Sequence, residues 1–166
     1  PADEALAYDV ETAKRMGYNM IRKHIKVEPA RWYFHCDRIG MIVWQDMPNG
    51  GGRWNNLHHL VLPNLVLGGV RVKDRPGKAL GRHEPASRDN YRKELGEMID
   101  ALYNVTSIGV WVPFNEAWGQ FDAADIAEWV QRRDPTRTVD HASGWHDQGA
   151  GDIASLHVYF RKLAMP

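Results

Sequence analysis

The chain has 166 residues, of which 43% are hydrophobic and 25% charged, a composition typical of a globular domain that buries a substantial core. Basic and acidic side chains balance at 21 each, so we expect neither nucleic acid nor a membrane surface as a partner. The single cysteine, Cys36, excludes an internal disulfide and leaves the cellular localisation undecided. No secretory signal opens the chain, and no apolar run approaches the roughly 20 residues that span a bilayer.

The first 46 residues predict helices and strands in alternation. Residues 3–16 form a helix that ends at Gly17. Its apolar side consists of Leu6, Val10, Ala13 and Met16. Residues 19–24 form a short strand, and Pro29 opens a second helix that ends at Gly40. The inward side of that helix consists of Trp32, Tyr33, Cys36 and Ile39. Residues 41–44 are the next strand, which runs out onto Gln45 and Asp46.

Residues 48–86 interrupt this alternation with glycines, prolines and basic side chains. We interpret them as a loop insertion with at most one short helix, near residues 57–67. An insertion of this length inside a compact domain is usually functional or disordered. The insertion over residues 48–86 begins directly after the polar end of a predicted strand.

The second half of the chain resumes the alternation. Ser87 is predicted to cap a helix. The buried side of that helix consists of Tyr91, Leu95, Met98, Ile99 and Leu102. A strand over residues 107–112 follows, and Asp122 with Asp125 marks the start of a helix that ends at residues 134–135. Residues 138–143 and 153–159 are the last two predicted strands.

Strands that alternate with helices predict a parallel sheet, because a parallel neighbour needs a crossover connection. A doubly wound sheet would be expected to carry a glycine-rich phosphate-binding turn, and none occurs. The predicted fold is therefore α/β, a (β/α)8 TIM barrel. Five predicted strands against eight in a closed barrel indicate a partial barrel, about strands two to six. We treat residues 1–166 as one domain.

The strand over residues 107–112 leads to Asn115 and Glu116. In barrels of this class, polar side chains at the carboxyl ends of strands line the active site. An alternative is that both residues only begin the next helix, because Asn and Glu are common there.

Four segments resemble the catalytic barrel of glycoside hydrolase family 2, which includes β-galactosidases, β-glucuronidases and β-mannosidases. They are residues 19–29 (NMIRKHIKVEP), 31–47 (RWYFHCDRIGMIVWQDM), 112–120 (VPFNEAWGQ) and 134–147 (DPTRTVDHASGWHD). The most specific motif is Asn115-Glu116, which stands at the end of the fourth barrel strand in this family and in the wider clan of retaining barrel glycosidases.

The resemblance implies roles for five side chains. Glu116 would be the general acid/base, and Asn115 would hydrogen-bond the sugar 2-hydroxyl. Arg22, at the tip of the second barrel strand, would lie near the nucleophile. Tyr159, on the sixth strand, would approach the same nucleophile. Asp46 would bind substrate or brace the site.

The nucleophile itself is missing from the predicted site. Retaining hydrolysis uses two carboxyl groups about 5–5.5 Å apart, and the family places its nucleophilic glutamate at the tip of the seventh strand. Four of the other glutamates lie on predicted helices or their approaches and are poor substitutes: Glu28, Glu94, Glu97 and Glu128. Asp46 and Asp140 stand closer to strand tips. We expect the nucleophile to lie downstream and these 166 residues alone to be inactive.

Three further side chains are candidates for the site. His24 and His157 are interpreted as hydrogen-bonding groups at strand tips, although a buried structural histidine is about as plausible for each. Trp145, in a glycine-flanked turn, is a candidate sugar platform. The eight histidines lack metal-binding spacing and no Cys-x-x-Cys occurs, so we expect no metal and no cofactor.

The predicted function is a retaining exo-β-glycosidase whose sugar the sequence does not decide. Two alternatives stay open, namely a non-catalytic carbohydrate-binding or structural fragment and a barrel glycosidase of another family in the same clan. A carbohydrate is the expected partner. A partial barrel leaves open sheet edges, so we also expect a possible homo-oligomer formed through them.

Overall fold

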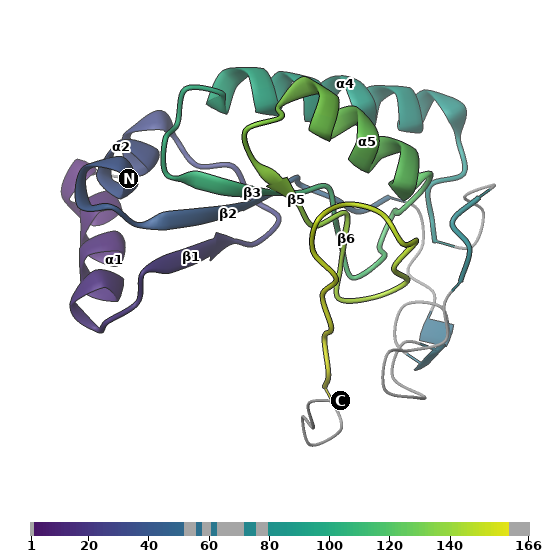
Figure 1. Ribbon diagram of the computed structural model, residues 1–166, viewed down its shortest axis with the longest axis horizontal. Coiled ribbons are helices and arrows are strands. Elements are labelled where there is room, and N and C mark those ends of the chain that lie inside the picture. The colour runs from purple at the N-terminus through teal and green to yellow at the C-terminus, as the bar shows by residue number, and fades with distance from the viewer. Residues whose placement is uncertain (1, 52–55, 58–60, 63–71, 76–79, 160–166) are drawn as a thin grey trace.

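The computed structural model describes residues 2–51, 56–57, 61–62, 72–75 and 80–159. Within these residues the centre of the fold is a parallel sheet in the order β1-β2-β3-β5 (Figure 1). Its strands are β1 (Met20–Lys23), β2 (Ile42–Asp46), β3 (Ile108–Val112) and β5 (Thr138–Val139). Parallel pairing brings the carboxyl ends of all these strands to the same edge of the sheet.

A second, two-stranded parallel sheet continues the ladder beyond this edge. Its strands are β4 (Phe114–Asn115) and β6 (Ala142–Ser143), which follow β3 and β5 along the chain. Pro113 separates β3 from β4, since proline has no N–H to give to a ladder. The predicted strand over residues 138–143 is likewise divided in two, with residues 140–141 between the parts.

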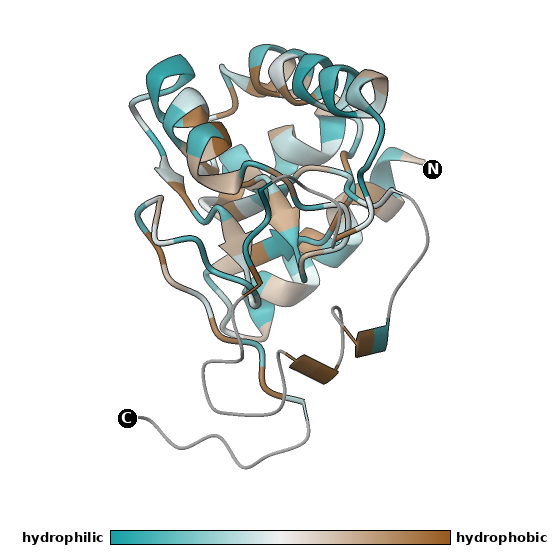
Figure 2. Ribbon diagram, turned by 90° about the vertical axis from the view of Figure 1, so that its right-hand side faces the viewer, coloured by the Kyte–Doolittle hydropathy of each residue, from teal (hydrophilic) through white to brown (hydrophobic). Residues whose placement is uncertain are grey.

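The helices α1, α2, α4 and α5 of the described residues pack around the sheet at the predicted places, and Figure 1 shows α4 and α5 side by side over one face. The bounds are α1 (Asp3–Arg15), α2 (Ala30–Ile39), α4 (Pro85–Leu102) and α5 (Ala123–Arg133). In Figure 2 the outer turns of the helices above the sheet are mainly hydrophilic, and hydrophobic residues gather toward the strands. Among the described residues, no helix is long and apolar enough to span a membrane.

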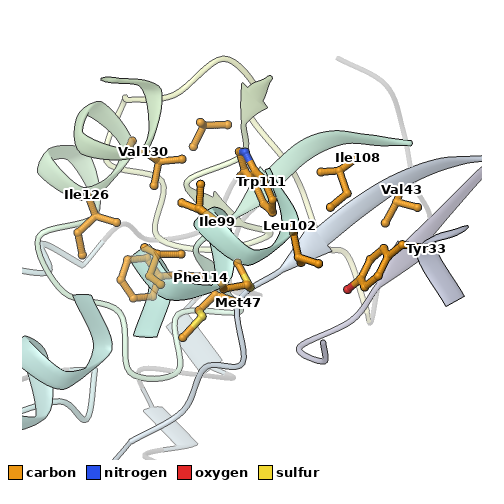
Figure 3. Packing of buried hydrophobic residues seen from close by; sticks show 14 of the residues in the cluster. Tyr33, Val43, Met47, Ile99, Leu102, Ile108, Trp111, Phe114, Ile126 and Val130 are labelled. Carbon is orange, nitrogen blue, oxygen red and sulfur yellow. The ribbon is translucent and has the colours of Figure 1, made fainter. Parts of the chain in front are cut away.

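The hydrophobic core lies between the helices and one face of the sheet (Figure 3). Val43 and Ile108 are paired in the ladder and both face this core. Side chains alternate between the two faces of a strand, so Ile42 and Met20, which also pair, lie on the opposite face. There Ile42 is 48% and Met20 43% exposed. The face away from the helices is therefore partly apolar and open, as in a barrel interior that further strands would cover.

The predicted buried sides of the helices are confirmed with one exception. The predicted core residues of α2 and α4 are buried or partly buried, and Cys36 is completely inaccessible. The prediction that Met16 is buried is wrong, because its side chain is 69% exposed. The helix ends at Arg15, so Met16 is the C-cap residue and no longer follows the helical periodicity.

Other boundaries also differ from the sequence expectations. Residues 153–159 form no strand, because they make an isolated backbone bond at His157 and no ladder. Ser87 is not a cap, since α4 already begins at Pro85, whose missing N–H suits a first helical position. Most of the short helix predicted near residues 57–67 lies outside the described residues. The open edges at β1 and β5 are present in the described sheet, and their pairing between copies stays a prediction.

Asp134 locks the end of α5 to the sheet. Its buried carboxylate accepts hydrogen bonds from Trp111 Nε1 at 2.8 Å, Thr136 Oγ1 at 2.6 Å and Arg137 Nη1 at 2.5 Å. Burial alone would raise the pKa of this carboxyl, but the hydrogen bonds from Thr136, Arg137 and Trp111 lower it to about 2. The ionised form of Asp134 is therefore a stabilising part of the fold.

We expect Asp134→Ala to destabilise the chain by about 2–4 kcal/mol at pH 7, because it leaves buried donors without an acceptor. The folded pKa is lowered from 3.8 to about 2, so this contribution is complete above the unfolded pKa and is lost as the pH falls toward 2. Urea unfolding of both proteins between pH 7 and pH 2.5 measures it. The exposed Asp89 on α4 is the matched control, and Asp89→Ala should change little. A deficit that is absent at pH 7 would contradict this account.

Candidate active site

Glu116 lies at the carboxyl edge of the sheet, immediately after β4. Its backbone N–H donates to Ser143 O at 3.0 Å, so the last ladder bond from β6 fixes the position of the residue. Its φ angle is 50° and that of Ala117 is 60°, which turns the chain sharply away from the sheet. The side chain emerges where the tips of β1 and β2 also end.

Arg22, Asp46 and Asn115 form one connected group at this edge. Arg22 Nε donates to Asp46 Oδ1 at 3.0 Å, and Arg22 Nη2 donates to Asp46 Oδ2 at 2.9 Å. The same Nη2 donates to Asn115 Oδ1 at 2.8 Å. A paired guanidinium and carboxylate have a fixed planar geometry, so Arg22 holds the Asn115 side chain in one orientation. The sequence had placed these three residues at strand tips, and the structure brings them into contact.

His157 and Tyr159 both contact the Glu116 carboxylate. His157 Nδ1 lies 3.0 Å from Glu116 Oε1, and the Tyr159 hydroxyl donates to the same oxygen. His157 Nε2 faces Arg22 Nη1 at 3.4 Å. The extended segment that carries both residues therefore reaches the site without forming a strand.

Gly144 provides the space in which the His157 ring lies. Its φ angle is 96°, and a Cβ at this position would lie 2.3 Å from the ring. Only glycine accommodates both this conformation and this approach.

Two opposing effects act on the pKa of Glu116. Burial raises it, whereas the hydrogen bonds from His157 and Tyr159 lower it, and the net result is a pKa below the usual value. The hydrogen bond to Glu116 in turn raises the pKa of Tyr159 to about 12. The site as it stands in these residues therefore favours the ionised form of Glu116.

The remaining predicted site residues, His24 and Trp145, lie beside this group. His24 is exposed, and its charge contributes to the lowered pKa of Glu116. Trp145 is 5% exposed, donates from Nε1 to His157 O at 3.2 Å, and places its ring 5.7 Å from that of Tyr159. In the structure Trp145 supports the segment that carries His157 and Tyr159, and its role as a sugar platform stays a prediction.

The other nearby carboxylates, Asp46 and Asp140, are buried, and Asp140 Oδ1 has no hydrogen-bond partner among the described residues. Asp46 is fully buried and uses both oxygens, since Oδ2 also accepts the backbone N–H of Ile25 at 3.1 Å. Asp140 is buried, accepts a hydrogen bond from Ser155, and has a pKa raised by that burial. Within the part of the chain that the structure describes, no group of three or more His, Cys, Asp or Glu side chains could hold a metal ion.

Sequence reasoning missed three residues that shape the site. Ser143 is predicted only as the end of a strand, and its carbonyl accepts the backbone N–H of Glu116. Gly144 and Asn49 lie in glycine-containing turns, and such a pattern predicts a turn without indicating what the turn contacts. The contact of Asn49 with the backbone around Glu116 depends on chain segments 66 residues apart, for which the sequence gives no signal.

Residues 2–164 match the family profile "Glycosyl hydrolases family 2, TIM barrel domain", which covers nearly the whole chain. The chain belongs to glycosyl hydrolase family 2. Among curated proteins of the family, a β-galactosidase of Enterobacter cloacae is 29% identical over 153 residues, which are 91% of this chain and 13% of the relative. A β-galactosidase of Psychromonas ingrahamii is 25% identical over 150 residues, or 90% of this chain and 12% of the relative.

Comparison with solved structures confirms the fold. A β-D-glucuronidase of Dictyoglomus thermophilum superposes with a TM-score of 0.59 at 19% identity and covers 84% of this chain. The match occupies 22% of that chain, so the present residues correspond to part of one family 2 barrel. The parallel sheet and its helices are thus a partial TIM barrel, as the sequence predicts.

The lowered pKa of Glu116 predicts the effect of one substitution in this family 2 site. Tyr159→Phe removes a hydroxyl that favours the carboxylate, so the pKa of Glu116 should rise toward its ordinary value. Carbon-13 NMR titration of the Glu116 carboxyl in the chain measures the change. Tyr103→Phe, at the exposed end of α4, is the control and should leave this pKa unchanged. A lower pKa in Tyr159→Phe would contradict the assigned contact.

Proposed function

We propose that the chain supplies the acid/base side of a retaining exo-β-glycosidase, with Glu116 as the general acid/base. The observation that carries the proposal is the position of the Glu116 carboxyl at the carboxyl edge of a parallel barrel sheet, next to an Asn115 side chain that Arg22 fixes. The alternative that Asn115 and Glu116 only begin a helix has less support, because α5 starts at Ala123, seven positions after Glu116.

The proposed reaction has two steps. In the first, protonated Glu116 gives its proton to the leaving-group oxygen while the nucleophilic carboxylate attacks the anomeric carbon and the glycosidic bond breaks. In the second, ionised Glu116 takes a proton from water, whose oxygen attacks the anomeric carbon and releases the nucleophile. The same carboxyl thus acts as acid and then as base.

The environment of Glu116 suits both steps once a second carboxylate is present. An ionised nucleophile about 5–5.5 Å away would raise the pKa of Glu116 by like-charge repulsion and favour the protonated acid. When the nucleophile carries the sugar its charge is gone, and the hydrogen bonds from His157 and Tyr159 then favour the carboxylate base.

The other contacts support substrate-binding roles. We propose that Asn115 donates from its amide nitrogen to the sugar 2-hydroxyl, because its oxygen is already taken by Arg22. Asp46 holds Arg22 in place. His24 and Trp145 are proposed to line the sugar site from the two sides of Glu116.

We propose that the nucleophile is a glutamate from outside these 166 residues. No glutamate follows Glu128 in the sequence, and Asp46 is held on both oxygens by hydrogen bonds. On this proposal the 166 residues alone have no turnover, and hydrolysis abolished by Asp46→Ala would contradict it.

A β-linked sugar is the proposed substrate. The chain spans only 12% and 13% of the two curated β-galactosidases described above. The identity of the sugar therefore stays open.

Glu116→Ala in the complete enzyme should reduce hydrolysis of glycosides with poor leaving groups by about 10²–10⁴-fold, because these need protonation. Aryl glycosides with strongly activated leaving groups need little protonation, so their glycosylation step should change far less. Steady-state kinetics on both substrate types, with Glu94→Ala on the surface of α4 as the control variant, measures the difference. An equal loss of kcat/KM on both types would overturn the acid/base assignment.

A further inference from the structure

The backbone that carries Glu116 is held in an unfavourable conformation. Glu116 and Ala117 both have φ angles in the left-handed region, at 50° and 60°. For residues other than glycine this conformation is unfavourable and persists only where surrounding contacts enforce it. The contacts that enforce it therefore determine where the Glu116 carboxyl lies.

Asn49 bridges the two ends of this turn. Its amide nitrogen donates to Asn115 O at 2.8 Å and to Trp118 O at 3.3 Å, which are the carbonyls on either side of Glu116 and Ala117. An asparagine amide has two N–H donors, so one half-buried side chain binds both carbonyls at once. Asn49 also follows β2 by three residues, and the last residue of β2, Asp46, orients Asn115 through Arg22.

Two more contacts from residues 48–86 support the same turn. The backbone N–H of Gly119 donates to Leu80 O at 2.7 Å, and Arg82 Nε donates to Gly119 O at 3.2 Å. A Cβ on Gly119 would lie 2.3 Å from Gly50 O, so the two segments approach as closely as backbones allow. The ends of the loop insertion thus enclose the turn that carries Glu116.

We propose that Asn49 is a positioning residue for acid/base catalysis by Glu116, an inference that rests on the proposed function. Asn49 does not contact the Glu116 carboxyl or the reacting atoms. It acts by fixing the peptide units from Asn115 to Trp118, and hence the direction in which the Glu116 side chain leaves the backbone. A displacement of about 1 Å in a catalytic group can reduce a rate by about 10²-fold.

The test compares three variants of the complete enzyme. Asn49→Leu keeps a similar volume and removes both donors, and Asn49→Gln restores an amide on a longer side chain. Asn90→Leu is the matched control, since the Asn90 amide donates to Glu94 Oε1 at 2.9 Å on the exposed surface of α4. Each variant is assayed for kcat and KM on a glycoside with a poor leaving group and on an activated aryl glycoside, and its thermal melting is recorded.

The expected result is a kcat/KM about tenfold lower or more for Asn49→Leu on the poor leaving group, with less than about threefold loss of kcat/KM on the activated substrate, because kcat/KM reports the leaving-group step and not the second step that both substrates share. KM should change little, Asn49→Gln should recover part of the loss, and Asn90→Leu should behave as the wild type. An equal loss of kcat/KM on both substrates, or a lowered melting temperature with unchanged kcat/KM, would show a structural role only and overturn the proposal.

The Glu116→Ala variant separates this inference from the proposed function. If Glu116→Ala shows the leaving-group dependence and Asn49→Leu does not, only the role of Asn49 is overturned. If Glu116→Ala itself shows no such dependence, the acid/base assignment fails, and the positioning role fails with it.

Discussion

The ion pair between Arg22 and Asp46 connects the tips of neighbouring strands, and the geometry of the whole site depends on it. Asp46 is completely buried, and such a charge is tolerated only with a partner and with its remaining oxygen bonds satisfied. Arg22 supplies two of these bonds and the backbone of Ile25 supplies a third. Because Arg22 also binds Asn115, one cation fixes side chains from β1, β2 and β4 relative to one another.

The parallel ladder explains why these residues meet. Arg22 pairs with Trp44 in the register of β1 and β2, and Asp46 pairs with Val112 in that of β2 and β3. Since every strand of a parallel sheet ends at the same edge, polar side chains at the strand ends lie close together even though they are far apart in the sequence. Glu116 directly follows the short β4–β6 ladder, which extends the chain beyond the main sheet before the turn at Glu116 and Ala117.

Hydrophobic periodicity was sufficient to predict most of this framework. Apolar side chains at helical spacing correctly indicated α1, α2, α4 and α5, and short branched runs between turn residues correctly indicated the strands that carry Arg22, Asp46 and Asn115. These patterns succeed because burial against a single core decides both the element and its inward face. The polar residues at the ends of these apolar runs then indicated the edge of the sheet at which the site lies.

Features that depend on contacts between distant segments could not be predicted in this way. Residues 153–159 have the alternation of a strand, but a strand exists only where a neighbour completes its ladder, and the described residues provide none. Asp122 correctly marked the start of α5, but the sequence does not indicate that Asp74, in the loop insertion, accepts the N–H of Ala123 through Oδ2. The hydrogen bonds of Asn49 to Asn115 O and Trp118 O likewise exist only in the folded chain.

The central claim is that Glu116 is the acid/base of a retaining enzyme, and the product that Glu116→Ala forms with azide tests it most directly. Azide in the space left by the carboxyl would attack the glycosyl-enzyme intermediate from the face that the leaving group vacated. The account predicts faster turnover of an activated aryl β-glycoside with added azide and a β-glycosyl azide as the product. An α-glycosyl azide would mean that Glu116 occupies the nucleophile's position, and the account would then be wrong.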